Sequence, residues 1–179
     1  LASALLSLYL DGPLDELLEP YERLFPAQPA PLHKLRRAHV LELYHGPTAA
    51  FKDMALTVFP SLLRYAKTRL GIPEELVILT ATSGDTGSAA LAGFDGLEGM
   101  KIMVFYPRGG VSAIQEKQML LKRQGNTQTV QVRGDFDACQ RAVKTLFTDQ
   151  ALQLELAAAG YRLSSANSIN IGRLLPQIV

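Results

Sequence analysis

The chain has 179 residues, 47% of them hydrophobic and 20% charged, and its net charge is +1. This composition is typical of a globular enzyme and excludes a disordered chain. The charges are balanced and form no long run of one sign, so nothing indicates binding to nucleic acid or a membrane, and the cytoplasm is the default location. The single cysteine, Cys139, excludes an internal disulfide and a cysteine-rich metal site; no metal is expected, and Cys139 itself is predicted to be buried.

Residues 1–38 differ from the remainder of the chain. Leucines recur there at helical spacing, and Gly12-Pro13 and a proline-rich stretch over residues 26–31 interrupt them. We predict short helices followed by an extended connector. The expected division is therefore a helical and extended N-terminal segment over 1–38 and a partial α/β domain over 39–179.

From residue 39 onward, apolar runs with strand character alternate with amphipathic stretches. The expected strands cover residues 40–44, 76–80, 101–106, 127–132 and 161–164; the expected helices cover 52–70, 86–94, 112–124 and 135–149, with a last one from about 170. Such alternation predicts an α/β fold with a parallel sheet and right-handed βαβ crossovers. Ligands of these folds bind beyond the carboxyl ends of the strands, where we place residues 45–53, 82–88 and 164–173.

Lys52 follows a Gly-Pro turn and begins the predicted helix 52–70. A cation at this position opposes the helix macrodipole, so a purely structural role is a poor explanation for it. The same position favours the neutral amine, which is the form that attacks an aldehyde. The alternative is a surface lysine at the edge of a loop, and position alone favours that alternative.

The stretch around Gly84 and Gly87 precedes another predicted helix. The glycines let backbone amides approach an anion, and the helix adds its positive end, so the loop and its hydroxyls suit a carboxylate or phosphate. Its spacing matches neither a Walker loop nor a dinucleotide fingerprint. The alternative is a tight turn in which Ser83 or Asp85 caps the helix.

Polar residues are dense over 164–173. Arg173 follows Asn170 by three positions, so both share one face of the predicted helix, and an arginine there can bind a phosphate through two hydrogen bonds. The alternative is helix capping by Asn167, Ser168 or Asn170, with Arg173 in solvent, and this segment taken alone favours that alternative.

Together these segments resemble threonine synthase. The resemblance covers about residues 40–179, is most specific around Lys52 and residues 83–87, and is carried by residues 45–53, 81–90, 106–110, 115–117, 134–140 and 165–173. Threonine synthases are fold-type II enzymes that depend on pyridoxal phosphate (PLP) and are related to the tryptophan synthase β-subunit. They convert O-phospho-L-homoserine and water into L-threonine and phosphate.

This resemblance implies that Lys52 binds PLP covalently and moves protons at the substrate α-carbon, with the cofactor as electron sink. It implies a cofactor-binding loop, in which Ser83 and Thr86 also receive the substrate carboxylate, formed by Ser83, Gly84, Asp85, Thr86 and Gly87. It further implies a substrate-phosphate site formed by Asn167, Ser168, Asn170 and Arg173.

Three neighbouring residues receive other roles. Because two carboxylates repel each other, we expect Asp85 to orient a donor rather than contact the substrate carboxylate. Phe51 is expected in the core, and His45 is expected to bond to backbone.

Members of the family are much longer than this chain. We therefore expect a fragment truncated at both ends, in which open sheet edges and apolar surface favour association. The loop for the cofactor phosphate is expected beyond residue 179, so the fragment alone would hold PLP weakly and turn over nothing. Two alternatives remain: a non-catalytic threonine synthase-like protein that binds PLP or a phosphorylated ligand, and an unrelated Rossmann-like domain that binds a nucleotide phosphate at residues 83–88.

Overall fold

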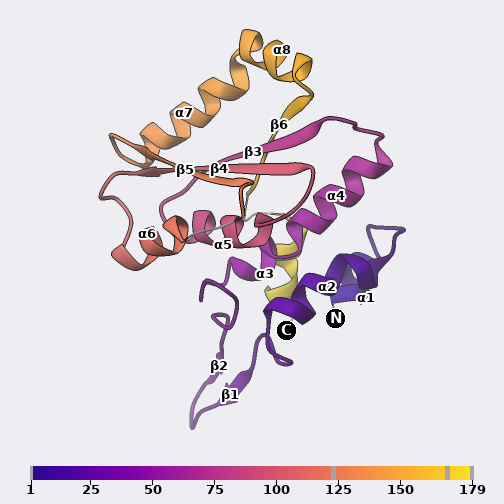
Figure 1. Cartoon of the computed structure of the whole chain (residues 1–179). Coiled ribbons are helices and arrows are strands. Elements are labelled where there is room, and N and C mark those ends of the chain that lie inside the picture. Colours follow the sequence, from indigo (N-terminus) through magenta and orange to yellow (C-terminus); the bar gives the residue numbers. More distant parts are fainter. Residues whose placement is uncertain (1, 122–123, 168–169, 178–179) are drawn as a thin grey trace.

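A four-stranded parallel sheet forms the centre of the protein, as the computed structural model shows (Figure 1). The structure describes residues 2–121, 124–167 and 170–177. The strands lie in the order β5-β4-β3-β6, with bounds Glu75–Ala81 for β3, Met100–Pro107 for β4, Thr127–Val132 for β5 and Tyr161–Ser165 for β6. In this register Ile78 of β3 lies opposite Ile102 of β4 and Ser164 of β6. The predicted α/β class and parallel sheet are confirmed.

Helices cover both faces of this sheet, as in a doubly wound fold. On one face lie α3 (Asp53–Leu56), α4 (Phe59–Arg69), α5 (Asp85–Phe94) and α6 (Ala113–Leu120). On the other face α7 (Phe136–Thr148) packs on β3 and β4, and α8 (Gln150–Ala158) follows it beside β6. The chain moves outward from β3 to β4 and β5, and then crosses back to place β6 on the other side of β3.

Two apolar clusters fill the space between the sheet and its helices. The larger one lies under α5, where Phe94, Ile78, Ile102 and Val104 are almost fully buried. The smaller one lies under α7, where Leu79, Phe105 and Cys139 are the buried members. The predicted burial of Cys139 is confirmed, and burial raises the pKa of its thiol.

The expected strand 40–44 lies outside the parallel sheet, so its placement there was wrong. Instead, β2 (His39–Leu41) pairs antiparallel with β1 (Leu32–Lys34) in a hairpin that projects from the body of the protein (Figure 1). The residues of this hairpin are mostly exposed, so packing against the main sheet does not stabilise it. The hairpin crosses residue 38, where the sequence predicts the N-terminal segment to end; that division stays a prediction.

The predicted helices of the N-terminal segment are α1 (Ala2–Leu6) and α2 (Leu14–Leu24), and α2 packs against α4. The Tyr21 hydroxyl of α2 donates a hydrogen bond to the Met54 carbonyl of α3. Helix α2 therefore contacts α3, the helix that directly follows Lys52.

The predicted helix 52–70 is in fact two helices, α3 and α4, separated by Thr57 and Val58. Pro60 lies in the first turn of α4 and has no N–H to donate to the Leu56 carbonyl, so a continuous ladder of hydrogen bonds cannot form. As a result, the helix that Lys52 precedes has only four residues. The macrodipole that Lys52 faces is that of a single turn.

Two further boundaries depend on capping residues. Asp135 caps α7 as predicted, because its carboxylate accepts the Ala138 amide at 2.8 Å. Helix α8 was not predicted, and its first turn is capped in the same way by Asp149. The predicted last helix is a 3-10 helix, η1 (Ile171–Gln177), which packs against α3.

No helix in the described part of the chain combines the length and apolarity needed to cross a membrane.

Candidate functional site

The candidate site lies where the parallel sheet changes its winding direction, at the carboxyl ends of β3 and β6. Strand β3 ends at Ala81 and β6 at Ser165, and the Thr80 hydroxyl donates to the Ala166 carbonyl at 2.9 Å, so the two exits lie side by side. Such switch points are the usual ligand sites of open α/β sheets. Residues 82–88 and, among the described residues of the third segment, 164–167 and 170–173 lie at or just beyond the ends of these strands, as predicted. Residues 45–53 reach this edge from the hairpin instead.

A buried carboxylate shapes the loop that carries Lys52. Asp53 is only 1% exposed; it accepts the Thr48 amide at 2.8 Å, the Thr48 hydroxyl at 2.5 Å and the Ala50 amide at 3.4 Å. Ala49 between them has a positive φ of 57°, which an L-residue rarely adopts. A side chain at Gly46 would lie 2.5 Å from the Asp53 Cβ. The loop is therefore wound tightly around Asp53, which fixes the start of α3.

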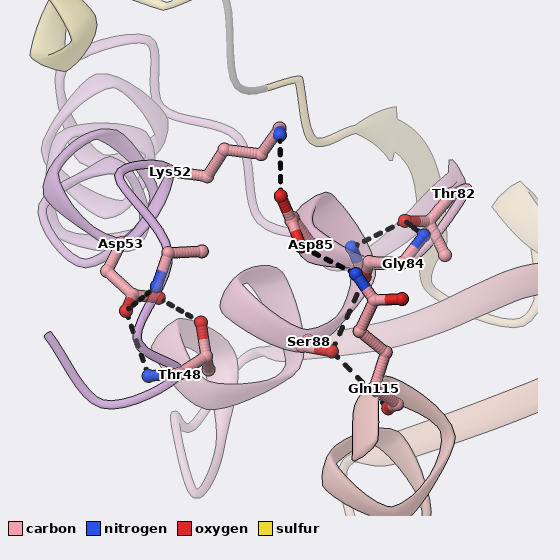
Figure 2. Close-up of polar contacts among 10 residues, drawn as sticks. Thr48, Lys52, Asp53, Thr82, Gly84, Asp85, Ser88 and Gln115 are labelled. Atoms are coloured by element: carbon pink, nitrogen blue, oxygen red, sulfur yellow. Dashed lines mark hydrogen bonds and ion pairs between the residues drawn. The ribbon is translucent and has the colours of Figure 1, made fainter. Parts of the chain in front are cut away.

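Lys52 points from this loop toward the first turn of α5. Its Nζ lies 3.2 Å from Oδ2 of Asp85, and its side chain is 21% exposed (Figure 2). The second Asp85 oxygen, Oδ1, accepts a hydrogen bond from Nε2 of Gln115 at 2.7 Å. The expectation that Asp85 orients a donor agrees with this geometry, since its carboxylate faces one ammonium group and one amide N–H.

The loop before α5 is organised by Thr82, which is buried. Its hydroxyl oxygen accepts the amides of Gly84 at 2.9 Å and Gly87 at 2.8 Å (Figure 2). Gly84 has a φ of 140°, a conformation that requires glycine, and it caps α5 without a side-chain hydrogen bond. The alternative in which Ser83 or Asp85 caps this helix is therefore wrong.

The first amides of a helix have no acceptor within it. In α5 the amide of Gly87 is taken by Thr82, while those of Asp85 and Thr86 have no acceptor among the described residues. Ser83 is exposed and Thr86 half-buried beside these amides. The turn thus presents N–H groups and hydroxyls to an anionic ligand.

The third segment reaches the same site through Arg173. Its guanidinium lies 5.2 Å from the centre of the Phe51 ring, and the Lys52 amine lies 4.5 Å from the centre of the same ring. Two cations therefore gather around one aromatic side chain next to the first turn of α5. Asn170 accepts the Gly172 amide through Oδ1 at 2.9 Å and donates to the Asn167 carbonyl at 2.8 Å, so Asn170 holds the turn that positions Arg173. Ser168 lies outside the described residues.

Two expectations for neighbouring residues were wrong. Phe51 is 37% exposed and does not pack in the core, because it contacts the two cations. His45 bonds to the Glu42 carboxylate at 2.6 Å rather than to backbone, and this hydrogen bond lowers the pKa of Glu42.

Sequence reasoning also missed Thr82 and Gln115. For Thr82 a signal existed, since a hydroxyl residue just before a helix often accepts its first amides. Gln115 lies in residues 115–117, which resemble threonine synthase, but nothing in the sequence indicated its contact with Asp85, which is 30 positions away.

An amine that reacts with the aldehyde of a cofactor must be accessible and must stand near groups that bind anions. Lys52 meets both conditions, because its side chain is partly exposed and lies near Arg173 and the first turn of α5. In that turn the backbone amides of Asp85 and Thr86 have no acceptor among the described residues, and we call them the open amides of α5. This geometry fits PLP at Lys52. Within residues 2–121, 124–167 and 170–177, no cluster of three or more His, Cys, Asp or Glu side chains could hold a metal ion.

The fold and the site together are those of an α/β enzyme that uses a lysine amine at the carboxyl edge of its parallel sheet, where ligands of such folds bind. Residues 25–170 match the family described as pyridoxal-phosphate dependent enzyme. The chain belongs to this family. Its cofactor is accordingly PLP.

Comparison with known proteins points to one branch of that family. The threonine synthase of Escherichia coli (strain K12) is 45% identical over 164 residues, a match that covers 91% of this chain and 36% of that protein. Threonine synthase-like 1 of Homo sapiens is 44% identical over 148 residues, covering 78% of this chain and 19% of that protein. The PLP-bound threonine synthase of Brucella melitensis superposes with a TM-score of 0.82 at 36% identity, covering 99% of this chain and 38% of that one. The chain spans about a third of the length of the curated threonine synthases that it matches.

Proposed function

We propose that the chain forms the lysine-bearing part of a threonine synthase, which acts in the cytoplasm on O-phospho-L-homoserine and water to give L-threonine and phosphate. The observation that carries the proposal is the Lys52 amine, held 3.2 Å from Asp85 at the first turn of α5, in a chain 45% identical to the Escherichia coli enzyme. PLP, when bound at Lys52, supplies the electron sink for the reaction.

Each side chain then has a role that follows from its chemistry. Lys52 holds the cofactor covalently and, as a free amine, moves the proton at the substrate α-carbon. The loop of Ser83, Gly84, Asp85, Thr86 and Gly87 lies against the cofactor. In that loop the open amides of α5 and the hydroxyls of Ser83 and Thr86 suit the substrate carboxylate.

The substrate phosphate is assigned to the segment after β6. The Arg173 guanidinium can bind a phosphate through two parallel hydrogen bonds. The Phe51 ring, which also contacts the Lys52 amine, holds the guanidinium near Lys52. Asn167, Ser168 and Asn170 complete the proposed phosphate site. A dianionic phosphate placed here would meet the Arg173 guanidinium, which offsets part of the cost of removing it from water.

The lysine assignment can be tested on the chain itself. We expect incubation with PLP and reduction with borohydride to attach the cofactor irreversibly to Lys52, as mapped by peptide mass spectrometry. A matched variant, Lys52→Arg, keeps the charge but cannot form the reducible bond, so its peptide should stay unmodified. Labelling spread over surface lysines with none at Lys52 would contradict the assignment.

The activity can be tested by a chimera in which this chain replaces the matching stretch of the Escherichia coli threonine synthase. We expect phosphate release from O-phospho-L-homoserine, and its loss in the Lys52→Ala chimera by a factor of at least about 1,000, because no other group holds the cofactor covalently. The likeness to threonine synthase-like 1 favours one alternative, a protein that binds PLP or a phosphorylated ligand without turnover. A chimera that takes the cofactor at Lys52 but releases no phosphate would support that alternative.

A further inference from the structure

Gln115 of α6 contacts the site through the carboxylate of Asp85. Its Nε2 donates to Oδ1 of Asp85 at 2.7 Å, and the other oxygen of the same carboxylate, Oδ2, faces the Lys52 amine at 3.2 Å (Figure 2). A continuous chain of polar contacts thus runs from α6 through the first turn of α5 to the lysine loop. Gln115 lies in it at the end opposite Lys52.

The orientation of the Gln115 amide is determined by its second partner. Its side-chain Oε1 accepts a hydrogen bond from the backbone N–H of Ser112 at 3.0 Å. The Ser112 hydroxyl in turn accepts one from the backbone N–H of Gln115 at 3.2 Å, and the two bonds form a capping box at the start of α6. A reversed amide would set an oxygen against the carboxylate and an N–H against an N–H. Both contacts would be repulsive, so Nε2 must face Asp85.

The side chain of Gln115 also lies directly against the loop before α5. A Cβ at Gly84 would come within 2.4–2.5 Å of three atoms of the Gln115 amide group. The absence of a side chain at Gly84 is therefore what lets Gln115 cross the loop and reach Asp85. Since Gly84 also needs its positive φ, two independent features of the loop depend on this glycine.

We propose that Gln115 is a positioning residue, which acts through Asp85 and holds the carboxylate turned toward Lys52. This inference rests on the proposed role of Lys52 in binding the cofactor. With its two oxygens held by Gln115 and Lys52, Asp85 is kept from turning toward the open amides of α5. Those amides then remain available for the carboxylate of a substrate, which a freely rotating Asp85 would repel or replace.

The test measures how fast the Lys52 amine reacts with acetic anhydride in the cofactor-free chain, resolved by peptide mass spectrometry. The contact with Asp85 must break before the Lys52 amine can attack the anhydride, and a partly exposed pair contributes about 0.2–1 kcal/mol, so Asp85→Ala should speed acetylation of Lys52 about 1.4- to 5-fold. We expect Gln115→Met, which removes the donor at nearly constant volume, to act in the same direction by a smaller factor. Gln115→Asn, one methylene shorter, should behave like Gln115→Met.

Ser112→Ala is the matched control, because it removes the other half of the capping box and leaves Asp85 untouched. Acetylation of Lys101, whose amine bonds to Tyr161 away from the site, reports whether each variant stays folded. We expect both the Lys52 rate in Ser112→Ala and the Lys101 rate in all variants to stay at the wild-type value. An effect of Ser112→Ala equal to that of Gln115→Met would reduce Gln115 to a helix cap and overturn the proposal.

A double-mutant cycle tests whether Gln115 works through Asp85. In the Asp85→Ala background, Gln115→Met should cause no further change at Lys52, because the group that it positions is gone. A persisting effect would overturn the proposal. Trapping of PLP at Lys52 in the wild-type chain stays the separate test of the cofactor role, so failure of one is distinguishable from failure of the other.

Discussion

Asp53 is the residue on which the geometry of the lysine loop depends. Its carboxylate is buried and is bonded to Thr48 and Ala50, so the residue next to Lys52 is a structural centre of the loop. Burial raises the pKa of Asp53, and the hydrogen bonds from Thr48 offset part of that rise. The resemblance to threonine synthase implied a role for Lys52, but nothing in the sequence indicated this role for its neighbour, because burial of an aspartate depends on what packs around it.

The raised pKa of Asp53 makes a pH-dependent contribution to stability. The folded chain binds the proton more tightly than the unfolded chain, so the contribution is complete below the ordinary aspartate pKa and is lost as pH rises through the higher folded value. We expect the free energy of unfolding of the wild type, minus that of Asp53→Asn, to fall as pH rises from about 3 to 7. Urea unfolding of both proteins across this range measures it. A difference that stays flat or rises would contradict the assignment.

At the scale of elements, the contact of α3 with α5 decides where Lys52 lies relative to Asp85. The two helices approach so closely at Gly93 that a Cβ there would lie 2.3 Å from the Leu56 carbonyl oxygen. The sequence predicted α5 nearly at its observed bounds, whereas it predicted α3 and α4 as one helix. Amphipathic spacing continues through Thr57 and Val58, so the pattern gave no sign of the break; Pro60 did, through its missing N–H.

Substituting Gly93 tests this close approach. A methyl group forced into a packed site costs about 1–3 kcal/mol, which a gain of helix propensity of up to about 1 kcal/mol only partly offsets, because the obstacle is backbone and cannot rotate away. We therefore expect Gly93→Ala to lower the free energy of unfolding and to weaken trapping of PLP at Lys52.

Gly125→Ala is the control for this substitution. A Cβ at Gly125 meets nothing within 4 Å, so the stability should stay within about 0.5 kcal/mol of the wild type. Equal denaturation midpoints for the two variants would show that the gap between α3 and α5 can adapt.

At the scale of the whole molecule, the sheet was predictable and the site only in part. Long apolar runs such as residues 76–80 identify strands that are buried on both faces, and each parallel strand of the sheet lies within about two residues of its expected bounds. The contact of Lys52 with Asp85 joins residues 33 positions apart, and that of Arg173 with Phe51 joins segments that lie even further apart in the sequence. Motifs indicated that these segments meet; only the folded chain determines which atoms face each other.

The two faces of the sheet differ in how deeply they are packed, and this predicts an uneven stability. Under α5 the core includes Phe94, which is fully buried, whereas α8 on the opposite face has no buried residue among its members Gln150–Ala158. Regions with few buried apolar contacts open at a lower free-energy cost than the core. In native-state hydrogen exchange we expect the amides of β4 and α5 to open only with global unfolding and those of α8 to exchange by local opening.

Two substitutions separate these modes of opening. Phe94→Ala should cost about 3–5 kcal/mol and lower the protection of β4 and α5 by that amount, while the locally opening amides of α8 change much less. Leu154→Ala, on α8 and 72% exposed, should leave the protection of β4 within about 0.5 kcal/mol of the wild type. Protection of α8 equal to that of β4 would mean that the sheet and both helix layers unfold as one unit. The expected pattern instead makes the face with Lys52, Asp85 and Gln115 the rigid one, as precise placement of a reactive amine requires.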